Sequence, residues 1–152
     1  MISINPFTFE SAADMVELIR TDGVLRSELG LDKTEFSAEE EFRFVSEWCK
    51  KKSSESFDIR FENEFAGMIS LSHIDLENKK TGVGYWVGSK FRGKGIGKKA
   101  FELILDIAKS KGLEILQSDI DRNNLFSLKI WQKYSPEISE KNEKQVSVKI
   151  KI

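Results

Sequence analysis

The stretch TGVGYWVGSKFRGKGIGKKAFELILDIAKSK, Thr81 to Lys111, decides the fold of this chain. Its first residues alternate with the period of two that a strand requires, placing Val83, Tyr85 and Val87 on one face. Its second half places apolar residues on one stripe of a helix that Gly112 ends. That stripe comprises Ile96, Ala100, Leu103, Ile104, Ile107 and Ala108. The stretch therefore predicts a strand, a glycine-rich loop and a helix in succession.

The loop between strand and helix, Arg92 to Gly97, has the composition of an anion-binding site. The first N–H groups of a helix lack partners within it, and the helix dipole adds partial positive charge there. Glycines let the backbone take positive φ and let a bulky anion approach closely. No acidic residue interrupts the basic ones, which are Lys90, Arg92, Lys94, Lys98 and Lys99. We predict that the loop binds a phosphate; the alternative is a solvated basic loop.

Two known phosphate-binding fingerprints fit this loop incompletely. The dinucleotide pattern G-x-G-x-x-G is met at Gly93 and Gly95, but Lys98 stands where the third glycine belongs. The P-loop pattern G-x-x-x-x-G-K-[ST] is met from Gly88 to Lys94, but Gly95 replaces the residue that would hold magnesium. A nucleotide-binding P-loop protein is therefore the least favoured of three functional hypotheses.

A third pattern, R/Q-x-x-G-x-G, is complete at Arg92, Gly95 and Gly97, and here the chain resembles the GCN5-related N-acetyltransferases. The segment GYWVGSKFRGKGIG is most similar to the branch that acetylates ribosomal-protein N-termini and polyamines. The segments GMISLSHID and ILQSDIDRNNLFSLKIWQKY extend the resemblance over most of the chain. It implies an α+β fold, with a mixed, mostly antiparallel sheet flanked by about four helices. In that fold, two parallel strands joined by a helix splay apart.

The resemblance also implies how acetyl-CoA is held. The pantetheine arm would lie between the splayed strands and bond the backbone of the fourth strand, while the loop would take the pyrophosphate. An Asn-x-x-Ser pattern, Asn124 and Ser127, would lie beside the pantetheine and the sulfur. The implied acetyl-CoA-binding residues are Trp86, Val87, Gly88, Arg92, Gly93, Lys94, Gly95, Ile96, Gly97, Lys98, Asn124 and Ser127. The implied reaction is direct attack of a primary amine on acetyl-CoA in a ternary complex.

This chemistry needs a base for the amine and a donor for the leaving thiolate. An amine attacks a thioester only when neutral, yet a lysine-like amine has a pKa of about 10. The resemblance implies that Ser127 serves the thiolate, as the matching serine does in the ribosomal-protein branch, and Trp131 stands where many other relatives carry a tyrosine. Tyr134 is the alternative donor.

The base is less clearly marked, because Gly82 stands where relatives often carry a glutamate. His73 is the only histidine, and its ordinary pKa of about 6.5 suits a base. The alternatives are Asp75, Glu77 and Asp119. With the family's glutamate and tyrosine both missing, a catalytically silent acyl-CoA-binding module of the same fold remains an alternative function.

The composition of the chain predicts its number of domains, its location and its partners. With 152 residues, 39% hydrophobic and 32% charged, the chain is expected to form one domain over residues 1–152. It shows no signal peptide or membrane span, and Cys49 is its only cysteine, so we expect a cytoplasmic protein without disulfides. We expect no metal, no nucleic-acid partner, no membrane partner, and a monomer or homodimer.

Charge is unevenly distributed along the chain. Residues 1–76 carry a net charge of −8, and residues 77–152 carry +7. The acidic half predicts a cationic amine as acceptor, steered by long-range attraction. The carboxylates expected near the acceptor are Glu28, Asp32, Glu35, Glu39, Glu40 and Glu41. The alternative is that these residues only cap helices and keep the surface hydrated.

The rest of the chain is predicted by period and capping. A strand is expected over Ile2–Phe9, a helix beginning with a capping box at Ser11, and a second helix capped by Ser37. A hairpin is expected around the turn Glu62 to Glu64. After Gly112, the expected elements are a parallel strand over Leu113–Ile120, a helix capped by Asn124, and a closing strand over Gln145–Ile152.

Overall fold

The predicted strand, loop and helix lie at the centre of the structure, a computed structural model that describes residues 1–32 and 35–152. They are β4 (Lys80–Val87), the short helix η1 (Ser89–Phe91) and α4 (Ile96–Ser110). Before them come β1 (Ile2–Pro6), α1 (Phe9–Thr21), α2 (Gly23–Glu28), α3 (Ala38–Lys51), β2 (Glu55–Phe61) and β3 (Glu64–Asp75). After them come β5 (Ile115–Asp121), α5 (Leu125–Gln132), β6 (Glu137–Glu140) and β7 (Gln145–Lys151).

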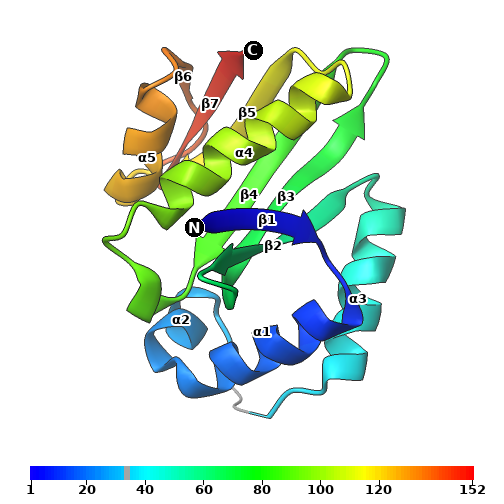
Figure 1. The fold of residues 1–152 in the computed structure, drawn as a ribbon. Helices are drawn as coiled ribbons and strands as arrows, with labels where there is room; N and C mark the ends of the chain where they lie inside the picture. Colours follow the sequence, from blue (N-terminus) through cyan, green and yellow to red (C-terminus); the bar gives the residue numbers. More distant parts are fainter. Residues whose placement is uncertain (33–34) are drawn as a thin grey trace.

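The seven strands form one twisted sheet in the order β1-β2-β3-β4-β5-β7-β6 (Figure 1). Every neighbouring pair is antiparallel except β4 and β5, which α4 connects in parallel. These two strands pair only from Lys80 opposite Ile115 to Gly82 opposite Gln117. Beyond Gly82 they diverge, so the α+β fold and its splayed parallel strands are confirmed.

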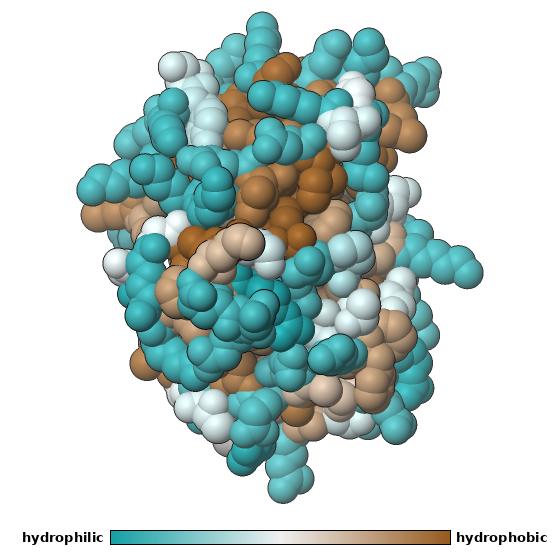
Figure 2. Space-filling model, viewed as in Figure 1, coloured by the Kyte–Doolittle hydropathy of each residue, from teal (hydrophilic) through white to brown (hydrophobic). Residues whose placement is uncertain are grey.

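The two faces of the sheet are covered differently. On β2, Asp58 and Arg60 form hydrogen bonds with Ser11 and Asp14 of α1, so α1 covers the face to which these side chains point. The intervening Ile59 points to the other face and is fully buried. On that second face α4 crosses the sheet beside β1, and apolar side chains reach the surface near this crossing (Figures 1 and 2).

The core lies mainly between the sheet and α4. Phe101, Ile104 and Ala108 of α4 are fully buried there. The predicted apolar stripe is partly wrong: Phe101 and Leu105 are buried, Ile107 packs against the core only partly buried, and Leu103 is not part of the core. The buried face is shifted because α4 packs against α5 as well as the sheet, with the Phe101 and Trp131 rings 5.0 Å apart.

Some predicted boundaries near the N-terminus are also wrong. The first helix begins at Phe9 with Thr8 as its cap, so the strand ends at Pro6 rather than Phe9. Ser11 is the third helical residue: its N–H donates to the Thr8 hydroxyl, and its own hydroxyl donates to Asp58 at 2.7 Å. Because its hydroxyl bonds to Asp58 of β2, Ser11 lies inside the helix, and Thr8 is the cap.

Other local predictions are confirmed. Ser37 caps α3 by accepting from the N–H of Glu40, and Glu62 and Asn63 take positive φ in the hairpin turn. The strand β6 was not predicted. Its four residues, EISE, are all exposed, so no alternation of burial marks them. They form a strand because β7 offers them a free edge.

Candidate functional site

The divergence of β4 and β5 opens a cavity of about 240 Å³ between the two strands and the start of α5. From Val83 onward, β4 has no strand partner on the β5 side. Between Val83 and Trp86 its backbone polar groups on that side are therefore available to a ligand, whereas the Val87 carbonyl accepts from Arg92. The cavity is lined by Val83, Gly84, Tyr85, Ser118, Asp119, Ile120, Asp121, Asn124, Ser127 and Gln145.

The N-terminus of α4 carries no side-chain cap, unlike those of the other four α-helices that the structure describes. Those four are capped by the side chains of Thr8, Asp22, Ser37 and Asn124. At α4 the cap residue is Gly95. The Gly95 carbonyl accepts from the N–H of Lys99, which is the first backbone hydrogen bond of the helix. The N–H groups of the first turn are thus left to bind an anion.

Glycine is required at this terminus for two separate reasons. Gly93 and Gly95 have φ of 78° and 74°, a conformation that side chains disfavour. Gly97 instead lies under the Phe126 ring of α5, where an added Cβ would meet Cζ at 3.0 Å. The first two glycines shape an open loop, and the third lets α5 pack closely beside it.

The side chain of Arg92 does not extend from the loop into solvent. Its Nε and Nη2 donate to the carbonyl of Val87 at 3.2 and 3.0 Å. Its two Nη atoms also form a bidentate ion pair with Glu28 of α2, at 2.8 and 2.7 Å. The guanidinium therefore holds the loop to the end of β4 and to α2, and the backbone N–H groups at the start of α4 are left free for a phosphate.

A second carboxylate of the same helix holds the loop. Asp22 is buried, caps α2 by accepting from Leu25 N–H, and accepts from both the N–H and the hydroxyl of Ser89 at 2.7 Å. Burial by itself raises the pKa of Asp22, but these hydrogen bonds lower it below its ordinary value. Asp22 therefore holds Ser89, just before the loop, to the start of α2.

Ser127 lies on α5 at the wall of the cavity. Asn124 caps α5 by accepting the Ser127 N–H at 3.1 Å, so the predicted Asn-x-x-Ser pair is joined directly. The Ser127 hydroxyl is 2.5 Å from the hydroxyl of Tyr85 on β4. The two groups come from opposite walls of the gap between sheet and helix.

Tyr85 is the residue at this site that sequence reasoning missed. It was placed only on a face of the strand, together with Val83 and Val87. That face points towards α4, where the Tyr85 ring packs edge-on against Phe101 at 6.1 Å. Its position on the same face as two buried valines was the available signal, but its partner 42 residues away was not predictable.

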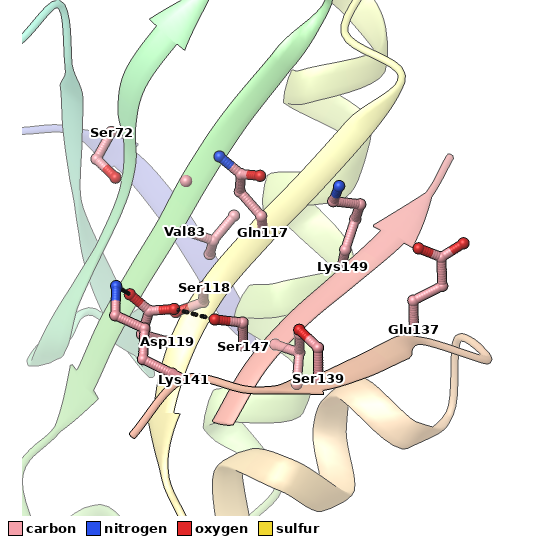
Figure 3. Close-up of a pocket in the computed structure, with 12 residues that line it drawn as sticks. Ser72, Val83, Gln117, Ser118, Asp119, Glu137, Ser139, Lys141, Ser147 and Lys149 are labelled. Carbon is pink, nitrogen blue, oxygen red and sulfur yellow. Dashed lines mark hydrogen bonds and ion pairs between the residues drawn. The ribbon is translucent and has the colours of Figure 1, made fainter. Parts of the chain in front are cut away.

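A larger cavity of about 570 Å³ opens on the opposite face of the sheet (Figure 3). Gln117 and Asp119 of β5, with Ser147 and Lys149 of β7, point into it, away from the helices behind the sheet. Gly82, Val83 and Ser118 line it at the point where β4 and β5 separate, and Val83 and Ser118 also line the smaller cavity. The two cavities thus adjoin each other at the point where β4 and β5 separate.

The candidate bases lie in different places. Asp119 lines both cavities, including the smaller one that Ser127 lines, but an ion pair with Lys141 and a hydrogen bond from Ser147 lower its pKa, making it a weak base. His73 is exposed, with φ of 51°, in the irregular end of β3. Because Tyr85 pairs with Ile69, His73 lies four residues further along β3, roughly 13 Å away. The structure does not bring His73 to Ser127, and it lines neither cavity.

Comparison with known proteins agrees with this geometry. The sequence model of the Acetyltransferase (GNAT) family matches residues 24–135. The chain belongs to the GNAT family. The match covers β4, the loop and α4, and both residues of the Asn-x-x-Ser pair. The predicted resemblance is therefore confirmed at the level of the family.

Individual GNAT relatives are more distant. The chain is 44% identical over 38 residues to YdaF of Bacillus subtilis (strain 168), named as a candidate ribosomal N-acetyltransferase. That match spans 25% of this chain and 21% of YdaF. The structure matches that of RimL, a ribosomal L7/L12 alpha-N-protein acetyltransferase, with a TM-score of 0.79 and 17% identity over 99% of this chain and 90% of RimL. The match to RimL shows that the two chains share a fold.

A third GNAT relative shows the same fold over its whole length. The N-acetyltransferase PseH of Campylobacter jejuni, solved in complex with acetyl coenzyme A, matches with a TM-score of 0.74 and 21% identity over 99% of each chain. In residues 1–32 and 35–152, no group of three or more His, Cys, Asp or Glu residues could hold a metal ion. No helix in these residues is long and apolar enough to cross a membrane.

Proposed function

We propose that this chain is an acetyl-CoA-dependent N-acetyltransferase that acts on a primary amine in a ternary complex. The observation that carries the proposal is the uncapped N-terminus of α4, next to strands that diverge towards Ser127. The loop N–H groups from Gly93 to Lys98 would hold the pyrophosphate, and the backbone of Trp86, Val87 and Gly88 would flank the pantetheine. The open backbone at Gly95 and the unpaired part of β4 fit such a ligand.

The same groups support the chemistry. The amine nitrogen forms a bond to the thioester carbonyl carbon, the carbon–sulfur bond breaks, and its electron pair leaves with sulfur. The amine releases its proton to solvent, which also supplies the proton of the free thiol. Ser127, with its hydroxyl in the smaller cavity, is positioned to donate a hydrogen bond to the developing thiolate.

The amine would approach from the larger cavity, on the other face of the sheet. Its lining offers hydroxyl and amide oxygens, and it carries the carboxylates of Asp119 and Glu137 beside the ammonium groups of Lys141 and Lys149. We propose a cationic acceptor, such as a polyamine or a basic N-terminus, on the acidic balance of residues 1–76. Glu28 is excluded from steering it, because Arg92 neutralises that carboxylate.

Two glycines at opposite ends of α4 provide the test of acetyl-CoA binding. Gly95 and Gly112 have φ of 74° and 79°, and neither has an atom within 4 Å of an added Cβ. Gly95→Val and Gly112→Val should therefore lose similar stability through backbone strain. Only Gly95→Val should weaken binding of coenzyme A, by about tenfold or more, in calorimetry. If the two variants bind coenzyme A with equal affinity, the loop is not part of the coenzyme A site.

The second candidate, a silent acyl-CoA-binding module, is favoured by one observation. Gly82 offers no side chain to the larger cavity, and neither cavity is lined by a histidine. Release of free thiol from acetyl-CoA with a panel of polyamines, neutral amines, acidic amines and basic peptides separates the two functions. Binding without turnover would favour the silent module, and a preference for neutral or acidic amines would contradict the cationic acceptor.

A further inference from the structure

The pair formed by Tyr85 and Ser127 joins the two walls of the smaller cavity. Tyr85 comes from β4 and Ser127 from α5, and their hydroxyl oxygens are 2.5 Å apart. Ser127 is buried, and its N–H is already committed to Asn124. The conformation of the serine hydroxyl is therefore decided by the phenol that it faces.

Either hydroxyl of this pair could donate, and the phenol is the better donor. With an ordinary pKa of about 10, a phenol is a stronger donor and weaker acceptor than an aliphatic hydroxyl. Burial raises the pKa of Tyr85 further, against smaller lowering effects of Ser127 and Trp131, so the phenol keeps its proton near neutral pH. Its proton is then available to the oxygen of Ser127.

Trp131 supplies a second and independent observation. It is fully buried, and its indole Nε1 has no hydrogen-bond partner in the part of the chain that the structure describes. The rings of Tyr85 and Trp131 both pack edge-on against Phe101, at 6.1 and 5.0 Å, and Trp131 acts to lower the pKa of Tyr85. An indole donor beside the phenol favours the arrangement in which the phenol proton points to Ser127.

We propose that Tyr85 is a positioning residue that donates to the Ser127 oxygen and so turns the Ser127 proton into the cavity, towards the leaving sulfur. The proposal rests on the proposed acetyl transfer. It explains how the site works with Trp131 in place of the tyrosine expected on α5. Tyr85 itself does not give up its proton, because a free thiol is the stronger acid. The serine hydroxyl is thus a fixed dipole, oriented before charge develops on sulfur.

Kinetics of single and double variants test this coupling. Tyr85→Phe removes only a hydroxyl, and we expect it to lower kcat about tenfold with little change in KM for acetyl-CoA. Ser127→Ala should have a similar effect, and the double variant should be no slower than the slower single variant. Tyr134→Phe is the matched control, since Tyr134 also packs on Phe101, at 5.4 Å. Its kcat should stay within about twofold of the wild-type value.

A spectroscopic measurement separates this inference from the proposed function. The chain has two tyrosines, so the Tyr134→Phe variant leaves Tyr85 alone in the carbon-13 spectrum of the tyrosine Cζ atoms. That signal should shift when Ser127→Ala is added and when coenzyme A is bound. If the wild-type protein never turns over, the proposed function fails, and this signal still decides whether the pair exists. An unshifted signal, a normal kcat for Tyr85→Phe, or additive effects would overturn the positioning role.

Discussion

Arg92 donates two hydrogen bonds to the carbonyl of Val87, the last residue of β4, and so ties the glycine-rich loop back to the strand that precedes it. The same guanidinium is paired with Glu28 of α2. The arginine of the R-x-x-G-x-G pattern therefore orders the loop, while the backbone N–H groups are left to the ligand. Residues outside the pattern, such as Glu28, share in this role.

We expect Arg92→Lys to weaken coenzyme A binding about fivefold, because a lysine cannot bond Val87 and Glu28 at once. Glu28→Gln, which leaves the loop untouched, should weaken it about threefold, since this partly exposed ion pair contributes less than about 1 kcal/mol. Glu64→Gln is the control, because its exposed ion pair with Lys90 bears on the same loop without ordering it. Calorimetry that shows loss for Arg92→Lys alone would instead indicate direct contact between guanidinium and phosphate.

Asp22 should make the stability of the loop region depend on pH. Because its folded pKa is lowered, its stabilising effect is full above the ordinary carboxyl pKa of 3.8 and is lost as pH falls through the folded value. Asp22→Asn should lower the free energy of unfolding by about 2 kcal/mol at neutral pH, and the difference should shrink below about pH 4. Asp106→Asn, the same change on the exposed face of α4, should have little effect in parallel urea titrations. A difference for Asp22→Asn that does not depend on pH would contradict this assignment.

Gly67 of β3 lies opposite the end of β4, with no room for a side chain. A Cβ there would lie 2.1 Å from the carbonyl oxygen of Trp86, whereas a Cβ at Gly84 would meet only the Ser70 hydroxyl at 3.7 Å. Gly67→Ala should therefore cost about 2 kcal/mol or more in free energy of unfolding, because backbone on both strands must shift. Gly84→Ala, on the neighbouring strand, should stay within about 0.5 kcal/mol of the wild type in urea unfolding. Similar values for both would show that the two strands adjust freely.

The pH dependence of kcat/KM should follow the ionisation of the acceptor amine. Neither cavity is lined by a histidine, so we expect kcat/KM to rise about tenfold per pH unit up to the pKa of the amine. His73→Gln should leave this profile unchanged, since His73 lies at the far end of β3. A plateau beginning near pH 6 to 7 that disappears in His73→Gln would restore the histidine as the base.

Features set by neighbouring residues could be predicted from the sequence alone. The strand, loop and helix of residues 81–111, the cap of α3 at Ser37 and the cap of α5 at Asn124 depend on contacts within a few residues. Such contacts form in the same way wherever the segment lies. The first helix shows the limit of this reasoning, because Thr8 and Ser11 were both suitable caps. The choice between them rests on the bond from Ser11 to Asp58, on another strand.

The tertiary structure decided what each side chain of the site faces. Arg92 was expected to belong to the phosphate site, but its guanidinium turns to Val87 and Glu28, the latter 64 residues away in sequence. The sequence predicted only that Tyr85 lies on one face of a strand. It contacts Ser127 because β4 and α5 line the same cavity. His73 has the right chemistry but lines neither cavity, because the register of β3 against β4 puts it four residues beyond the partner of Tyr85. Sequence determined which groups the chain possesses, and strand register and helix packing determined which of them meet.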